Sequence, residues 1–293
     1  MVRLMRCVTN RFRGENELPF FFGTPAILWQ IIFFIVPLLA ILFFSVSVFN
    51  SQGSLIGFSF ASFKYFFSMP YVWVILRSLW LAFFNVSVCF LVAYPVAYYL
   101  VFRAGSFKPL LFFLLVLPFW TNFLLHIFAW FFVLEKEGFL NLFLQSVGLI
   151  SKPLHLLNSS FAVYLMMVYY YLPFMILPLY AALDRFDGDL IEASYDLGAT
   201  WWQTIWKILI PSTAGGIVTG FFMVFVPSFG EFVIPELLGG DKIMYVGNVV
   251  SYLVLGENTG ALGGAFTVLS CLVLGLSAFV CYLGIVRLIK MLK

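Results

Sequence analysis

Long apolar runs dominate this sequence and set the strongest limit on how it can fold. A helix needs about 20 apolar residues to cross a bilayer, and six runs qualify: 24–49, 71–102, 109–134, 159–183, 212–235 and 259–286. Charged residues make up only 10% of the chain, against roughly 25% in a soluble domain. Because so few charges cannot cover a water-facing surface, we predict an all-α integral membrane protein with about six transmembrane helices.

Lysine and arginine in the connecting segments predict how the chain is oriented. With the N-terminus in the cytoplasm, eleven of the 16 basic residues fall in cytoplasmic segments and five in outer segments, which is the expected bias. The first apolar run is too long for a signal peptide and lacks a small-residue cleavage site, so we interpret it as a retained helix. We predict a basic cytoplasmic segment at 1–23, a transmembrane domain at 24–293, and both termini in the cytoplasm.

The motifs that the sequence lacks limit its chemistry. The net charge of +3 comes without a basic stripe, so a nucleic-acid partner is not expected. The four cysteines show no C-x-x-C spacing, and neither a disulfide framework nor a metal site is predicted. No phosphate-binding loop, dinucleotide motif or H-E-x-x-H occurs. We therefore expect no enzyme and no cofactor, and any energy from ATP must come from a partner.

Two glycine pairs have the spacing at which helices approach closely. They are Gly216-x-x-x-Gly220 and Gly260-x-x-x-Gly264. Small residues at this spacing let the backbones of neighbouring membrane helices come into contact. We expect close helix packing at both pairs.

The cytoplasmic segment 184–211 has the local chemistry of two short helices separated by a glycine. Asp189 is a candidate N-cap, with Glu192 three residues later. Gly198 suits the left-handed conformation that ends a helix, and Thr200 opens the second helix with a glutamine in the capping-box position. One apolar face of the first helix, at i, i+3 and i+7, consists of Leu190, Ala193 and Leu197.

This segment is longer than a simple connection requires, which predicts a docking element on the cytoplasmic face. The alternative is an amphipathic helix that rests on lipid. The acidity of the first helix opposes that alternative, because the inner leaflet is itself anionic. The acidic residues are Asp187, Asp189, Glu192 and Asp196.

The same segment resembles the EAA signature of ABC-importer permeases. The resemblance rests on Glu192-Ala193-Ser194, Gly198 and Ile208-Leu209-Ile210-Pro211, although Ser194 and Ile210 replace the usual Ala and Leu. It implies a type I ABC importer permease fold in which this loop is the coupling helix, seated on the ATPase subunit. The implied ATPase-coupling positions are Glu192, Ala193, Gly198, Leu190 and Leu197. The implied partners are an ATP-hydrolysing subunit, a second permease subunit and an extracytoplasmic substrate-binding protein.

Three further segments resemble permeases of spermidine/putrescine importers. They are Leu-Pro-Phe-Trp-Thr-Asn at 117–122, Leu-Pro-Phe at 172–174 followed by Pro-Leu-Tyr at 178–180, and Gly-Glu-Phe-Val-Ile-Pro-Glu-Leu-Leu-Gly-Gly at 230–240. This resemblance implies a polyamine as the cargo and the bacterial inner membrane as the location. The coupling loop by itself does not identify the cargo, because permeases for other solutes share it.

A polyamine pathway needs carboxylates for the ammonium groups and aromatic faces for cation–π contacts. Glu231 lies in an otherwise apolar stretch, either facing the pathway or ending a helix at the outer interface. Trp120 and Asn122 either line the pathway or pack between helices. Glu236 either meets the cationic cargo or lies in a solvated loop. For the lone His126 a hydrogen-bonded structural role is favoured over proton transfer. The candidate pathway residues are Trp120, Asn122, Tyr170, Glu231 and Glu236.

Other functions remain possible at this stage. The chain could be an ABC permease for another small solute, or a self-contained channel or secondary carrier. A membrane scaffold without transport is disfavoured by the buried acidic and proline positions. Uptake that requires ATP and a co-expressed ATPase indicates the ABC class, whereas gradient-driven uptake by this chain alone indicates a carrier.

Overall fold

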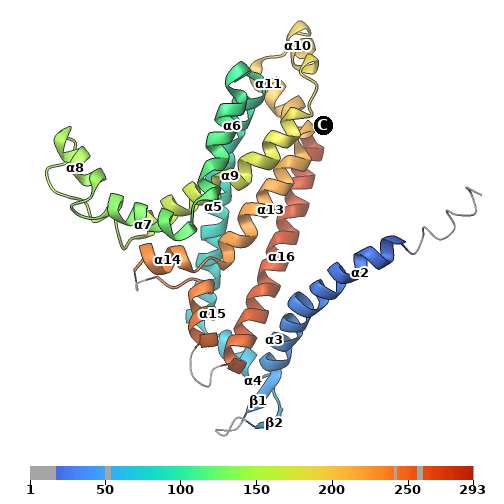
Figure 1. The fold of residues 1–293 in the computed structure, drawn as a ribbon, viewed down its shortest axis with the longest axis vertical. Coiled ribbons are helices and arrows are strands. Elements are labelled where there is room, and N and C mark those ends of the chain that lie inside the picture. Colours follow the sequence, from blue (N-terminus) through green and yellow to red (C-terminus); the bar gives the residue numbers. More distant parts are fainter. Residues whose placement is uncertain (1–17, 50–53, 241–242, 256–259, 293) are drawn as a thin grey trace, which may run out of the picture. The chain divides into compact units, whose positions relative to one another are not determined.

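The structure is a computed structural model that describes residues 18–49, 54–240, 243–255 and 260–292. Helices make up most of this part of the chain (Figure 1). The four arginines of the predicted segment 1–23 lie outside the described residues. The chain divides into two compact units, one of Met1–Tyr65 with Val254–Val268 and one of Phe66–Leu253 with Leu269–Lys293.

The first unit contains a long apolar helix followed by a small hairpin. The helix consists of α2 (Leu18–Gln30), the π-helical turn η2 (Ile31–Ile35) and α3 (Val36–Val46). Strands β1 (Ser47–Phe49) and β2 (Leu55–Phe58) pair antiparallel, with Ser47 opposite Phe58. Close packing at the second glycine pair is confirmed at Gly264, where an added Cβ would lie 3.1 Å from the backbone oxygen of Ile41. The prediction is wrong at Gly260, where an added Cβ would meet no described atom within 4 Å.

Three helices form the core of the second unit. They are α5 (Met69–Phe102), α9 (Ser160–Asp184) and α13 (Ala214–Gly230), which run side by side in Figure 1 and contact one another pairwise. At the centre, the side-chain amide of Asn85 in α5 donates a 2.8 Å hydrogen bond to the hydroxyl of Ser228 in α13. Both side chains are fully buried, so each polar group depends on the other for a partner.

The first glycine pair lets α13 approach α9 closely. A Cβ on Gly216 would lie 2.6 Å from the Cβ of Ala182, and one on Gly220 would lie 2.7 Å from the sulfur of Met175. At Gly216 the neighbouring atoms are a Cβ and a backbone oxygen that cannot move aside, and at Gly220 a side chain would have to displace the end of Met175. These approaches confirm the predicted close packing at both positions.

The number of membrane crossings agrees with the prediction when bent helices are counted as single spans. Four described helices are long and apolar enough to cross: Gly23–Val46, α5, α9 and α16 (Gly260–Leu292). Two helix pairs bring the number to six if each is counted as one span, and they are bent by 95° between Trp120 and Phe123 and by 72° between Ser212 and Ala214.

The predicted span at 109–134 falls within residues 105–146, which form a bent pair of helices. The segment contains the 3₁₀ turn η3 (Gly105–Phe107), α6 (Lys108–Val116), the 3₁₀ turn η4 (Leu117–Trp120) and α7 (Phe123–Leu134), with α8 (Phe139–Ser146) beyond. Pro118 has no amide hydrogen to continue the helix, and Thr121 is extended, with φ −96° and ψ 155°. A new helix then begins because the side chain of Asn122 accepts a 2.8 Å hydrogen bond from the amide of Leu124.

The predicted span at 212–235 corresponds to a helix that begins at Ala214 and ends at Gly230, the second part of a bent pair. It is preceded by α11 (Trp201–Thr204), the π-helical turn η5 (Ile205–Leu209) and α12 (Ile210–Ser212). The main helix, α13, ends at Gly230, and the short helix α14 (Val233–Leu238) follows before α15 (Val246–Leu255). The remaining short helices are α4 (Ala61–Phe66) and α10 (Asp189–Asp196).

Candidate functional site

The segment between α9 and α13 folds as two short helices joined at a glycine, and we call residues 187–204 the loop hairpin. Gly198 has φ +82°, as predicted for a helix stop. The amide of Ala199 donates to the carbonyl of Ser194 at 3.0 Å, and the amide of Gly198 donates to that of Tyr195 at 2.8 Å. These two bonds form a Schellman motif, which ends α10 and turns the chain sharply.

The capping predictions for the loop hairpin have different outcomes. The predicted N-cap at Asp189 is wrong, because α10 begins at Asp189 and its N-cap is Gly188. The carboxylate of Asp187 instead accepts the Asp189 amide at 3.1 Å. The capping box of the second helix is confirmed, since Thr200 and Gln203 each accept from the other's backbone amide, at 3.4 and 2.8 Å.

The predicted docking positions lie on the outer surface of α10. Glu192, Ala193 and Gly198 are exposed, and Leu190 and Leu197 are 50% and 89% exposed. An apolar pair this open, on a helix with an acidic first turn, forms a surface that a partner protein can cover. The structure brings all five predicted positions to this short helix and its end.

The opposite face of α10 is held against the second helix of the loop hairpin by two hydroxyl groups. Ser194 and Thr204 are buried, and their side-chain oxygens lie 2.9 Å apart. The Ser194 hydroxyl also donates to the carbonyl of Ile191 at 2.7 Å. An alanine at 194 would make neither bond, so the serine has a structural role that the sequence alone did not reveal.

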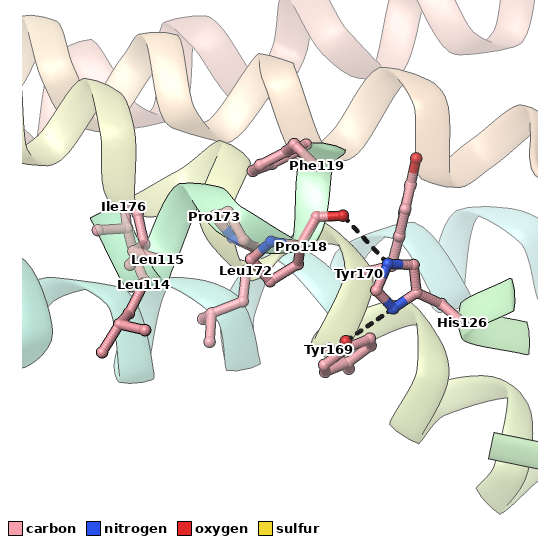
Figure 2. Close-up of a pocket in the computed structure, with 10 residues that line it drawn as sticks. All are labelled: Leu114, Leu115, Pro118, Phe119, His126, Tyr169, Tyr170, Leu172, Pro173 and Ile176. Atoms are coloured by element: carbon pink, nitrogen blue, oxygen red, sulfur yellow. Dashed lines mark hydrogen bonds between the residues drawn. The ribbon is translucent and has the colours of Figure 1, made fainter. Parts of the chain in front are cut away.

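The bend between α6 and α7 is tied to α9 through His126. One ring nitrogen, Nε2, lies 3.1 Å from the carbonyl oxygen of Pro118, and the other, Nδ1, lies 2.9 Å from the hydroxyl of Tyr169 (Figure 2). The hydroxyl of Thr121 also contacts Nε2, so both ring nitrogens of His126 have hydrogen-bond partners. The geometry agrees with the structural role favoured for His126, because the ring joins the carbonyl of Pro118, which also accepts from the amide and hydroxyl of Thr121, to Tyr169 in α9.

A pocket of about 190 Å³ lies beside this bend. Its walls come from α6, η4, α7 and α9, and they are apolar except near His126, Tyr169 and Tyr170. Figure 2 shows His126 between Pro118 and Tyr169 at one end of the pocket. Of the five predicted pathway residues, only Tyr170 lines it. Trp120 is 73% exposed and packs edge-on to Phe113, with ring centroids 5.7 Å apart.

Glu231 lies between two helices and not inside one. It follows the last residue of α13, and one carboxylate oxygen accepts the amides of Val233 and Ile234 at 3.0 and 3.4 Å. The other oxygen accepts a 2.8 Å hydrogen bond from the hydroxyl of Tyr171 in α9. The structure places Glu231 at a helix end, where its carboxylate accepts from the first two amides of α14.

Tyr171 is a site residue that sequence reasoning missed. It is only 5% exposed, and its ring centroid lies 5.4 Å from that of Tyr170. The structure therefore brings Tyr170 and Glu231 into one neighbourhood through Tyr171. Two signals pointed to Tyr171: the run of three tyrosines, and the need of a half-buried carboxylate for a hydrogen-bond donor. No spacing rule, however, connects Tyr171 to Glu231, which lies 60 positions away in the chain.

The other predicted pathway residues have separate structural roles. Asn122 caps α7, and Glu236 accepts a 2.6 Å hydrogen bond from the side chain of Asn248, which joins α14 to α15. The structure brings neither of them into contact with Tyr170 or Glu231. Within the described residues, no group of three or more histidine, cysteine, aspartate or glutamate side chains is arranged to hold a metal ion.

Comparisons with known proteins give similarities across almost the whole chain. Residues 26–290 match the family described as binding-protein-dependent transport system inner membrane component. The chain is 36% identical to the spermidine/putrescine transport system permease protein PotB of Haemophilus influenzae, over 95% of this chain and 96% of that protein. It is 38% identical to PotB of Escherichia coli, over 72% of this chain and 76% of that protein.

The fold is also similar to that of a solved transporter. The crystal structure of a bacterial ABC transporter involved in import of the acidic polysaccharide alginate matches with a TM-score of 0.74. The match covers 97% of this chain and 99% of that chain at 17% identity. At this identity the similarity concerns the fold.

Proposed function

The chain belongs to the family of binding-protein-dependent transport system inner membrane components, and from that premise we propose that it carries a polyamine across the membrane. As a member of this family it is a multi-pass membrane protein and a transport component, with an ABC-importer permease fold. Spermidine or putrescine is the proposed cargo. The observation that carries this choice is the 36% identity to a spermidine/putrescine permease along nearly the full length of both chains.

We propose that the energy for transport enters through the loop hairpin. The sequence contains no phosphate-binding loop, so a partner subunit hydrolyses the ATP. Glu192, Ala193, Gly198, Leu190 and Leu197 form the proposed contact with that subunit. Two exposed leucines favour a protein partner over water, and the acidic first turn of α10 disfavours the anionic membrane surface.

The loop hairpin is built to transmit motion without deforming. The Schellman motif, the capping box and the Ser194–Thr204 contact each tie one part of it to another. Because it connects α9 directly to the bent helix that leads into α13, a displacement at its outer face reaches two of the three core helices. We propose that closure of the ATPase pair moves these helices and exchanges outward-facing and inward-facing states.

We propose that the cargo passes close to Tyr170 and Glu231. The half-buried carboxylate of Glu231 supplies a negative charge beside aromatic rings, which is the combination that an alkyl diammonium ion prefers. One of its oxygens, Oε1, already accepts two amides, but Oε2 accepts only from Tyr171 and has capacity for a second donor. Trp120, Asn122 and Glu236 are proposed as more distant contacts along the route.

The remaining parts of the proposal concern the assembly. A family named for its dependence on binding proteins supports an extracytoplasmic substrate-binding protein as a partner. About six spans make half of a pathway, which supports a second permease subunit. The distribution of basic residues supports a cytoplasmic segment 1–23, a transmembrane domain at 24–293 and cytoplasmic termini.

Reconstituted transport tests the proposal. The chain is purified with its ATPase, second permease and binding protein and placed in vesicles, and uptake of radiolabelled spermidine is measured with and without ATP. We expect saturable uptake that requires ATP and the binding protein. If a different solute stimulates ATP hydrolysis by the assembly and polyamines do not, the proposed identity of the cargo is wrong. If vesicles with this chain alone accumulate spermidine from a gradient, the ABC mechanism is wrong.

A further inference from the structure

A second pocket, of about 410 Å³, lies in the part of the second unit where α5 begins. Its walls come from the first turns of α5, the start of α9 and the residues that precede α15. Four aromatic side chains and one arginine dominate the lining: Trp73, Arg77, Trp80, Tyr164 and Tyr245. None of these residues belongs to the proposed docking surface or cargo route.

The pocket has a positive charge without a counter-ion among the described residues. Arg77 is the only charged residue that lines it, and the only ion pair in the described part of the chain joins Lys108 to Asp184. Burial and the neighbouring Tyr164 raise the pKa of Tyr245 to about 12, although Arg77 opposes this rise. The Tyr245 phenol therefore stays neutral at physiological pH and does not compensate Arg77. Such a pocket repels a polycationic cargo and attracts an anion.

The position of Arg77 along α5 corresponds to the lipid headgroup region. Between Arg77 and Phe102 the helix rises about 37 Å, at 1.5 Å per residue, whereas the hydrocarbon core of a bilayer is about 30 Å thick. Arg103 and Lys108 follow the far end of α5 and mark one membrane interface. Arg77 therefore lies just beyond the hydrocarbon on the opposite side.

The flank of the pocket is suited to lipid. Trp73 and Trp80 are 57% and 64% exposed, and tryptophan at the membrane interface places its ring among the headgroups and upper acyl chains. With Leu76, also exposed, they form a stripe on α5 at i, i+3 and i+7 next to Arg77. A free phosphate ion would satisfy the arginine but would leave this apolar stripe in contact with water.

We propose that this pocket binds the phosphate group of a phospholipid in the leaflet opposite the loop hairpin. The Arg77 guanidinium donates to the phosphate oxygens, a pairing that its planar geometry favours. Trp73 and Trp80 cover the glycerol and the first acyl carbons. A lipid bound there bridges α5, α9 and the segment before α15, and it steadies the outer end of the core on which the cargo route depends.

Native mass spectrometry of the full chain, purified in detergent with its partner subunits, tests the proposal. Phosphatidylglycerol is titrated into the wild type and into Arg77→Gln, Arg77→Lys and Arg103→Gln. Because Arg77→Gln removes a charge-assisted hydrogen bond, we expect it to weaken the tightest lipid binding about tenfold. Arg77→Lys retains the charge and should recover most of the affinity. Arg103→Gln, at the other end of the same helix, should bind as the wild type does.

Four outcomes would overturn the assignment. The first is phosphatidylglycerol binding that is unchanged in Arg77→Gln, or equally weakened in Arg103→Gln. The second is equal binding of dioleoylglycerol, which lacks the phosphate. The third is binding of inorganic phosphate alone at the same site and affinity, which would make the ligand a free anion. The fourth is an Arg77→Gln variant that binds lipid normally but loses affinity for the binding protein, which would make the ligand a protein carboxylate.

Discussion

Single residues at the candidate sites serve both the fold and the proposed function. Glu231 caps α14 and accepts from Tyr171, and Ser194 links the two helices of the loop hairpin. A substitution that removes the side chain would disturb both roles together. Informative variants at this scale therefore keep the hydrogen bonds and change only the charge.

Glu231→Gln is expected to weaken polyamine transport while the protein stays folded. The glutamine oxygen can still accept from the α14 amides, but the negative charge that attracts an ammonium group is lost. We expect the KM for spermidine to rise about tenfold, the scale of one charge-assisted hydrogen bond. The measurement is initial uptake rate against spermidine concentration in reconstituted vesicles.

Tyr171→Phe is the matched control, because it removes the other half of the contact and leaves the carboxylate charged. We expect a smaller rise in KM for this variant. A wild-type KM in Glu231→Gln would remove Glu231 from the proposed cargo route. An equal rise in KM in both variants would show that the Tyr171–Glu231 hydrogen bond, and not the charge of Glu231, determines the KM for spermidine.

At the scale of elements, the proposed mechanism depends on two features: the loop hairpin and the close packing of α13 on α9. Both depend on glycine, for different reasons. Gly198 is needed for its left-handed backbone conformation, and an added Cβ there would meet no atom within 4 Å. Gly216 is needed for space, because α9 lies directly against it.

Gly198→Asp is expected to abolish polyamine uptake with little loss of folded protein. Asparagine and aspartate tolerate the left-handed conformation better than other residues with a side chain, so Gly198→Asn is the control for backbone strain. The aspartate adds a further negative charge at the proposed ATPase contact. We expect Gly198→Asn to retain most of the wild-type uptake, because asparagine is accepted at the left-handed position that ends a helix, with ATP-driven uptake as the measurement. Full activity of Gly198→Asp would contradict docking at this position.

Gly216→Ala is expected to destabilise the packing of α13 on α9. The new methyl group would lie 2.6 Å from the Cβ of Ala182 and 2.7 Å from the carbonyl oxygen of Pro178, and overpacking of this kind costs about 1–3 kcal/mol. Gly215→Ala is the control, since nothing lies within 4 Å of its added Cβ. Thermal unfolding in detergent, with the folded fraction measured by size-exclusion chromatography at each temperature, should show a lower midpoint for Gly216→Ala only. Equal midpoints would mean that α9 and α13 accommodate the added methyl group at little cost in free energy.

At the scale of the whole molecule, the proposed function depends on which side of the membrane each segment faces. The proposed docking surface must be cytoplasmic, where ATP is available. The residues before α15 must then face the other side. The distribution of basic residues supports this orientation.

Cysteine labelling tests the orientation directly. In a chain whose four native cysteines are replaced by alanine, we introduce Glu192→Cys or Met244→Cys, both at exposed positions. A membrane-impermeant maleimide added outside intact cells should label only Met244→Cys, and added to inside-out vesicles it should label only Glu192→Cys. Labelling of Glu192→Cys from the outside would contradict the proposed energy coupling.

Much of the architecture and part of the site could be predicted from local chemistry. Apolar runs long enough to cross the bilayer follow from the high cost of placing polar groups in hydrocarbon. The Gly198 stop and the Thr200 capping box follow from backbone rules that involve only neighbouring residues, and both are present. The exposed positions on α10 follow from the helical repeat.

The two bends and the contact of Glu231 depended on the tertiary structure. Pro95, Pro173 and Pro178 lie within continuous helices, whereas Pro118 lies at a 95° bend. The same residue type has both outcomes because a broken helix is tolerated in a membrane only where other groups satisfy its backbone, and at Pro118 the amide and hydroxyl of Thr121 and the ring of His126 do so. The partner of Glu231 likewise comes from another helix. The sequence by itself determined which segments enter the membrane, because the transfer free energy of a segment depends on its own residues. Only the tertiary structure decided where those segments bend and which polar groups meet, because both depend on residues far away in the chain.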